Sequence, residues 1–160
     1  MDKDLQHFLT HWFSGLMNGL ESVDAPARAT ILRACGQACA ASYTAEVFQR
    51  ARYQSADMEG FLARLAAEFP EATYTLLAPN TIRVCYTHCA CDLVRRGWVQ
   101  SPLLCGCSVH NLKENFERAL GIPVEVTLER SILGGASQCV FLVSWCIMEA
   151  IKEGFCAVWI

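Results

Sequence analysis

The first seventy residues place apolar side chains at helical spacing. Apolar positions recur every three or four residues over 5–20, which predicts an amphipathic helix. Asp24 suits the N-cap of a second helix, which runs from about residue 25 to residue 40 or beyond. A third helix is predicted over 57–69, where apolar residues again recur at helical spacing, and Pro70 ends it. The chain therefore opens with a helical part, residues 1–72.

The pattern then changes to the alternation that is typical of strands. Residues 73–77 and 81–86 flank a short turn and predict a hairpin, and 103–120 returns to helical spacing. Residues 124–129 and 139–145 predict a second hairpin around a Gly-Gly turn. The expected fold class is α+β, in which N-terminal helices pack on a four-stranded antiparallel sheet built as hairpin, helix, hairpin.

The length and composition favour one domain. A chain of 160 residues with 53% hydrophobic content can bury its apolar surface in a single core. Within this domain, residues 73–145 form the α+β core that follows the helical part. Residues 146–160 form an apolar tail, which we expect to dock on the body of the protein or on a partner.

The charge pattern excludes some function classes. The formal net charge is -3 and the basic residues are scattered, so we expect no nucleic-acid binding. Polar residues and a Gly-Gly pair interrupt the longest apolar stretch, residues 132–151, which argues against a membrane span. The acidic, polar N-terminus is unlike a secretory signal, and a cytoplasmic location is therefore expected.

Ten cysteines, most of them in close groups, are the main chemical feature of the chain. In a reducing compartment such groups favour metal ligation, redox chemistry, lipidation or simple burial over disulfides. Zinc is the metal that we favour, ahead of an iron–sulfur cluster, although the common Cys-x-x-Cys spacing does not occur. Cys35 and Cys39 fit a helix–helix contact better than a ligand role. The candidate metal ligands are Cys85, Cys89, Cys91, Cys105, Cys107 and Cys139.

Three residues near the start of the 103–120 helix are candidate catalytic groups. Cys105 and Cys107 lie where the helix dipole and free N–H groups favour a thiolate. His110 follows Cys107 by three residues, so it can share a helix face with the thiol and act as a general base. This arrangement would suit hydrolysis or thiol-based reduction. His88 is the other histidine close to the cysteines.

The second half of the chain, over residues 81–145, contains a set of short motifs: Cys105-Gly106-Cys107-Ser108, Leu120-Gly121, Pro123-Val124, Ser131, Gly134 and Cys139-Val140-Phe141. Together these motifs resemble the 4-vinyl reductase (4VR) domain family. This family is similar in fold to the ligand-binding domains of nitric-oxide-signalling and vesicle-tethering proteins. It includes sensor modules of aromatic-responsive transcription activators and proteins linked to tetrapyrrole synthesis, and the resemblance extends to uncharacterised bacterial proteins, so it implies small-molecule binding.

The resemblance also implies a zinc site, from which this chain departs at one position. In the sensor members, a carboxylate and three cysteines hold the metal. Two of the cysteines correspond to Cys105 and Cys139, but the third corresponds to Ser131. A hydroxyl is a poor zinc ligand, so a four-coordinate site would need further thiols. Those available are Cys85, Cys89, Cys91 and Cys107.

Three hypotheses of function follow. The first is a sensor or binding domain, whose pocket between helices and sheet takes a small hydrophobic or tetrapyrrole-like ligand and whose cysteines hold a metal. The second is a cysteine-dependent enzyme. The third is a structural protein that assembles as a homodimer or with another protein through apolar surface. The sequence does not name the ligand, the metal or the partner.

Overall fold

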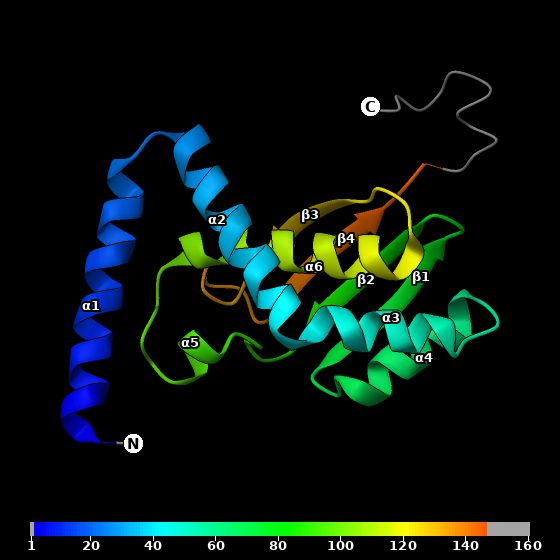
Figure 1. The fold of residues 1–160 in the computed structure, drawn as a ribbon, viewed down its shortest axis with the longest axis horizontal. Helices are drawn as coiled ribbons and strands as arrows, with labels where there is room; N and C mark the ends of the chain where they lie inside the picture. Colours follow the sequence, from blue (N-terminus) through cyan, green and yellow to red (C-terminus); the bar gives the residue numbers. More distant parts are fainter. Residues whose placement is uncertain (1, 147–160) are drawn as a thin grey trace.

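Helices form the first half of the chain in the computed structural model, which describes residues 2–146 (Figure 1). Asp24 and Asp57 cap their helices by accepting hydrogen bonds from the backbone N–H groups of Ala27 and Gly60. The three predicted helices are confirmed, and the second continues through a π-helical turn into another helix. The elements are α1 (Lys3–Ser22), α2 (Ala25–Cys39), η1 (Ala40–Thr44), α3 (Ala45–Tyr53) and α4 (Met58–Glu68).

The sheet contains four antiparallel strands, as predicted. They are β1 (Ala72–Ala78), β2 (Thr81–Tyr86), β3 (Glu125–Arg130) and β4 (Cys139–Ser144), in the order β1-β2-β4-β3. The two hairpins therefore meet through their second strands, β2 and β4. This register pairs Tyr86 with Cys139 and places the start of β4 beside the end of β2.

Between the hairpins, the chain forms a long helix that covers the sheet. The helix predicted from residue 103 begins slightly later, because Pro102–Leu104 forms a 3-10 turn (η2) before α6 (Cys105–Leu120). Gly121 ends α6 with a φ of 69°, a conformation that suits glycine. A short helix that the sequence pattern did not predict, α5 (Asp92–Arg95), lies in the cysteine-rich link before η2.

The main core lies between the helices and one face of the sheet. The side chains of Ile82, Val84 and Val143 are fully buried on that face, and three aromatic rings from α3, α4 and α6 pack above them. Phe48 and Phe61 meet the ring of Phe116 at 5.2 and 6.2 Å between centroids. This packing fixes α6 against the sheet, with α3 beside it over the same face, and α2 also packs against α6 (Figure 1).

A second, smaller apolar cluster attaches α1 to the rest of the protein. Met17 and Leu20 are buried against Leu32 and the segment that contains Val99 and Leu104. Near the start of α1, the Gln6 side chain accepts a hydrogen bond from the indole N–H of Trp98 at 2.7 Å. The opposite side of α1 is exposed, and no helix in the part that the structure describes has the length and apolarity to cross a membrane.

The predicted tail, residues 146–160, falls outside the described residues except for its first member. Its docking stays a prediction, as does the division of the chain into helical part, core and tail.

Candidate functional site

Several thiols gather at one end of the sheet, beside the start of α6. The antiparallel topology brings the end of β2, the end of β3 and the start of β4 to this end. Because α6 runs antiparallel to β3 after the turn at Gly121, its first residues arrive at the same place. The structure thus brings together Cys89, Cys91, Cys105, Cys107 and Cys139, each close enough to another thiol in this set to affect its titration.

Cys105 and Cys139 form the buried part of this thiol cluster, together with Ser131. Burial is the largest effect on Cys105 and raises its pKa, a hydrogen bond with Ser131 opposes this rise, and the neighbouring thiols add to it. The Ser131 hydroxyl also accepts a hydrogen bond from Gly134 N–H at 3.0 Å, and the Cys139 sulfur accepts one from Ile132 N–H at 3.3 Å. The serine therefore lies among the thiols that the resemblance pairs with it.

A second group of thiols lies between α2 and α6. Burial, followed by the thiols of Cys39, Cys35 and Cys91, raises the pKa of Cys107 to about 12. Cys91 also raises the pKa of Cys39, after burial. Cys91 therefore lies between the two groups, and Cys35 and Cys39 belong to the thiol cluster although the sequence favoured a packing role for them.

A glycine explains this convergence of α2 and α6. A Cβ atom at Gly36 would lie 2.5 Å from the backbone oxygen of Cys107 and 2.8 Å from the backbone nitrogen of Asn111. Only a residue without a side chain allows so close a crossing. Gly36 is adjacent to Cys35 and one turn from Cys39, so the same contact brings these thiols to Cys107.

Two residues of the cysteine-rich segment lie away from the cluster. Cys85 is opposite Val140 in the sheet, and the alternation of β2 directs it to the face opposite Val84 and Tyr86, which face the helices. His88 is exposed, and its ring contacts only the hydroxyl of Thr87 among the hydrogen bonds found in residues 2–146. The structure does not join either residue to the other candidate ligands.

The donor chemistry of the thiol cluster suits zinc, which is bound by deprotonated thiols. Within residues 2–146, however, no three or more histidine, cysteine, aspartate or glutamate side chains are assembled as ligands for a metal ion. The zinc ion that the resemblance implies, and the ligand set for it, stay predictions.

The candidate catalytic residues show no nucleophile–base contact within the described residues. Cys107 and His110 both lie on the side of α6 that meets α2, but Cys107 is beside Cys35 and Cys39, and His110 lines a cleft together with Arg33. Burial raises the pKa of both Cys105 and Cys107, which is the opposite of what an activated thiolate requires. The arrangement therefore gives no support to the nucleophile–base pair of the enzyme hypothesis.

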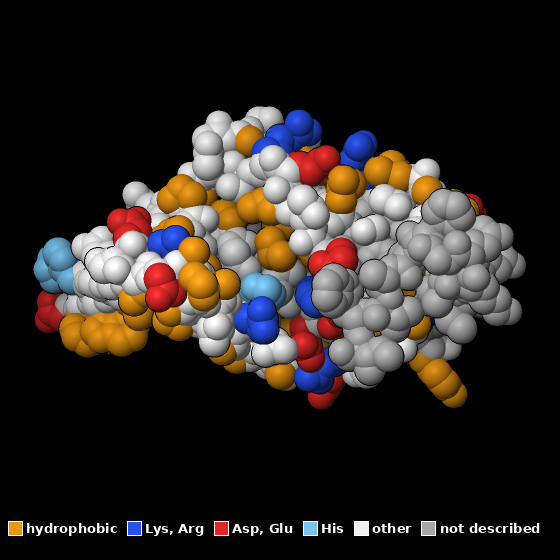
Figure 2. Space-filling model, turned by 90° about the horizontal axis from the view of Figure 1, so that it is seen from above, with side chains coloured by type: hydrophobic (Ala, Val, Ile, Leu, Met, Phe, Trp, Pro, Cys, Tyr) orange, Lys and Arg blue, Asp and Glu red, His pale blue; other side chains and the backbone are white. Residues whose placement is uncertain are grey.

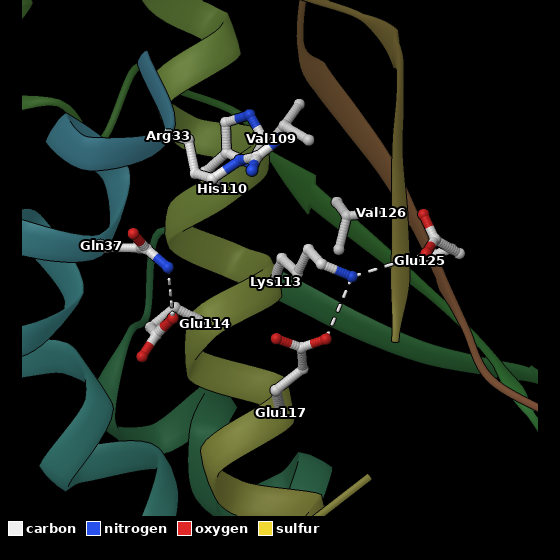
Figure 3. A pocket seen from close by; sticks show the side chains of 9 residues that line it. All are labelled: Arg33, Gln37, Val109, His110, Lys113, Glu114, Glu117, Glu125 and Val126. Atoms are coloured by element: carbon white, nitrogen blue, oxygen red, sulfur yellow. Dashed lines mark hydrogen bonds and ion pairs between the residues drawn. The ribbon is translucent and has the colours of Figure 1, made fainter. Parts of the chain in front are cut away.

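The cleft that contains His110 has a volume of about 510 Å³ and lies between α2, α6 and β3 (Figure 3). Val109 and Val126 contribute apolar side chains, and the remaining residues are polar or charged. Lys113, Glu114 and Glu117 of α6 are half-buried along the cleft. The other lining residues are Arg33, Gln37, His110 and Glu125.

Most charges in the cleft are paired. The Lys113 ammonium lies 3.0 Å from the Glu117 carboxylate and 3.5 Å from that of Glu125, and it donates to the backbone oxygen of Val124. Glu114 pairs with Arg118 at 2.7 Å and accepts a longer hydrogen bond from Gln37 (Figure 3). Burial lowers the pKa of His110, and the positive charges of Arg33 and Lys113 lower it further.

Sequence reasoning missed this cleft and the importance of Arg33. The available signal was Gly36, which lies three residues after Arg33 and marks a close helix contact. The pattern of α2 alone could not show that α6 would be the helix in contact.

Comparison with known proteins finds similarity in structure and not in sequence. The sequence matches no model of a protein family and no curated protein. Several solved structures are similar to this chain, including the following two. One is the phenol-responsive sensory domain of the transcription activator PoxR with phenol, at 13% identity and a TM-score of 0.55, covering 97% of this chain and 81% of that one.

The other is a trafficking protein particle complex subunit 3 from Naegleria fowleri, covalently bound to palmitic acid. It is also 13% identical, with a TM-score of 0.53, and the match covers 89% of this chain and 96% of that one. At these identities the comparison establishes the fold alone: this chain is similar in architecture to a phenol-responsive sensory domain and to a trafficking protein particle complex subunit.

Proposed function

We propose that this chain is a small-molecule-binding domain of the sensory type, with its ligand in the cleft between α2, α6 and β3. The cleft is the observation that carries the proposal. Its volume of about 510 Å³ is within the range of small-molecule sites, and it combines two valines with several polar groups. The similarity in fold to a phenol-responsive sensory domain supports the same class of function.

A ligand screen combined with a cleft-filling variant tests the proposal. The full chain would be mixed with a panel of small neutral and anionic organic molecules, phenol among them, and thermal unfolding would be followed. We expect at least one compound to raise the melting temperature, because a ligand that binds the folded state stabilises it.

The variant Val126→Trp should remove this shift, because its ring would occupy the cleft. Thr127→Trp is the matched control, since Thr127 is exposed on the other face of β3 and should leave the shift intact. A panel without any effect, or equal loss in both variants, would contradict the proposal.

The finer proposal is that the binding domain also holds zinc through Cys89, Cys91, Cys105 and Cys139. It is supported by the gathering of these thiols and by the resemblance of Cys105 and Cys139 to zinc ligands of the 4VR family. Such a metal would join the segment after β2 to α6 and β4, and would stabilise the end of the sheet.

A second candidate function, assembly with a second copy of this chain, is favoured by the outer face of α1. Leu5, Phe8, Trp12 and Leu16 share this face and are 47%, 57%, 53% and 41% exposed. Figure 2, in which α1 forms the left end of the molecule, shows apolar side chains gathered along that end. Gly15, three residues after Trp12, has no atom within 4 Å of the position that a Cβ would occupy.

Two copies of α1 would fit best in antiparallel orientation. Trp12 lies near the middle of the stripe, so Phe8 of each copy would face Leu16 of the other, and Lys3 would approach Glu21. Sedimentation velocity tests this arrangement: we expect a dimer that Trp12→Glu dissociates and that Tyr53→Glu, at a position 92% exposed on α3, preserves. A wild-type monomer at all concentrations would rule it out.

A further inference from the structure

The positive charge in the cleft is unevenly paired. Lys113 is engaged by Glu117 and Glu125, and Glu114 is engaged by Arg118. By contrast, the described part of the chain provides no hydrogen bond or ion pair for the Arg33 guanidinium, although it lines the cleft. An arginine that faces a cleft without a carboxylate partner is available to bind a ligand anion.

Arg33 lies beside His110, across the contact between α2 and α6. Figure 3 shows the two side chains together at one end of the cleft, away from the carboxylates of Glu117 and Glu125. Gly36 holds the two helices close at this level, since its missing Cβ would lie 2.7 Å from that of His110. The guanidinium and the imidazole therefore form one end of the cleft that is rich in hydrogen-bond donors.

The walls next to this end are apolar. Val109 precedes His110 on α6, and Val126 extends from β3 toward the same space (Figure 3). A ligand with a charged end at Arg33 would therefore place its remaining atoms against two valines. The three carboxylates elsewhere in the cleft would repel a doubly charged group such as phosphate more than a singly charged one.

We infer that the ligand of this cleft is a small organic monocarboxylate, whose carboxylate pairs with Arg33 and His110 and whose apolar body lies on Val109 and Val126. This inference rests on the proposed function, because it names the ligand class of the same cleft. An arginine fork binds both oxygens of a carboxylate, and a protonated imidazole adds a third donor.

Binding of such an anion would depend on pH. The polar and charged groups that line the cleft with His110 are Arg33 and Gln37 from α2, Lys113, Glu114 and Glu117 from α6, and Glu125 from β3. Burial, and then the charges of Arg33 and Lys113, disfavour the protonated form of His110, and a bound carboxylate would offset the two cations. The ligand should therefore raise the pKa of His110 and, by linkage, bind more tightly as the pH falls toward 6.

Calorimetry with the full chain tests the ligand class. The probes are benzoate and octanoate, with benzamide as the neutral relative of benzoate and inorganic phosphate as the competing anion. We expect at least one carboxylate to bind at least about tenfold more tightly than benzamide and phosphate, and more tightly at pH 6 than at pH 8. Arg33→Gln should remove that preference. Arg83→Gln, an exposed arginine on β2, should not.

A second readout separates this pairing from a general loss of structure. The histidine ring signals, followed by NMR between pH 5 and 8, should show a higher pKa for His110 when the bound carboxylate is present, and His110→Gln should remove the pH dependence of binding.

Equal binding of benzamide and benzoate, or carboxylate binding that Arg33→Gln leaves unchanged, would overturn the inference while the proposed function stands. If neither carboxylate binds but a neutral compound does, the inference also fails alone. If no compound of the wider panel binds, the proposed function fails as well.

Discussion

The hydroxyl of Tyr74 is a polar atom that the core does not satisfy. It is fully buried and makes no hydrogen bond of good geometry within residues 2–146, although the Tyr86 hydroxyl lies near enough to interact with it. Burial is the main reason that its pKa is raised, with the nearby hydroxyl of Tyr86 as a second cause. An unsatisfied buried hydroxyl lowers stability, because it loses its bonds to water without replacement.

We therefore expect Tyr74→Phe to raise the free energy of unfolding by about 1 kcal/mol. Urea unfolding of the wild type and the variant measures this change. Tyr43→Phe is the control, because Tyr43 is 57% exposed and its hydroxyl can reach water. A loss of stability of about 1 kcal/mol or more in Tyr74→Phe would mean that the hydroxyl has a favourable partner.

His110 gives the stability of the protein a pH dependence of known sign. Its pKa is lowered in the folded state by burial, Arg33 and Lys113, so the unfolded chain binds the proton more readily. The contribution is fully present above the ordinary pKa of 6.5 and is lost as the pH falls through the lower, folded value.

Thermal unfolding of the ligand-free protein between pH 7.5 and pH 5 should therefore show a falling melting temperature. The fall should be smaller in His110→Gln, which has no proton to gain. His88→Gln, at an exposed position, should behave like the wild type. An identical fall in His110→Gln would show that the histidine titrates alike in both states.

At the scale of elements, the crossing of α2 and α6 depends on Gly36. Alanine favours a helix over glycine by about 1 kcal/mol, but its Cβ at this position would clash with backbone atoms of α6. We expect Gly36→Ala to lower the free energy of unfolding by about 2 kcal/mol, because the helices must move apart.

Gly15→Ala is the matched control for this substitution. No atom lies within 4 Å of the Cβ that alanine would add there, so the variant should gain about 0.5 to 1 kcal/mol from helix propensity. Denaturant unfolding of both variants gives the comparison. Equal stabilisation by the two alanines would contradict the close crossing.

Most elements could be predicted from periodicity, because their apolar positions are also their buried positions. Ile82 and Val84 alternate in β2 and are buried together, and Leu112 and Phe116 are buried one turn apart in α6. The short helix α5 and the π-helical turn η1 have no such pattern, because their conformation depends on contacts with other elements.

The candidate site was predicted only in part, and from the family resemblance instead of from periodicity. The resemblance connected Cys105, Ser131 and Cys139, and these residues do lie together. Cys85 lies on the face of β2 that points away from the helices, and the sequence alone does not say which face of the strand the helices cover. The cleft was missed because its charges are ordinary on a helix surface, and only the approach of α2 and β3 makes them a site.

At the scale of the whole molecule, the metal content of the purified protein tests whether the thiol cluster binds zinc. Protein purified without oxygen should contain zinc if Cys89, Cys91, Cys105 and Cys139 act as ligands. Ser131→Cys should bind zinc more tightly than the wild type, because it replaces a hydroxyl beside Cys105 with a thiol.

Competition with a coloured chelator measures the zinc affinity of both proteins. Ser137→Cys is the control, because it adds a thiol in the loop before β4 and outside the set that the resemblance identifies. If neither the wild type nor Ser131→Cys retains zinc, the proposal that these thiols bind the metal is wrong. If the two serine variants gain affinity equally, the position of Ser131 has no special role.

The absence of a side chain at Gly36 also has a mechanical consequence. The first two turns of α6 place both Cys107 and His110 against α2, so a compound that displaces α2 from α6 would also separate Cys39 from Cys107. The exposure of these two thiols would then change when a ligand fills the cleft. The rate at which an alkylating reagent modifies Cys39 and Cys107 would therefore report whether the cleft is occupied.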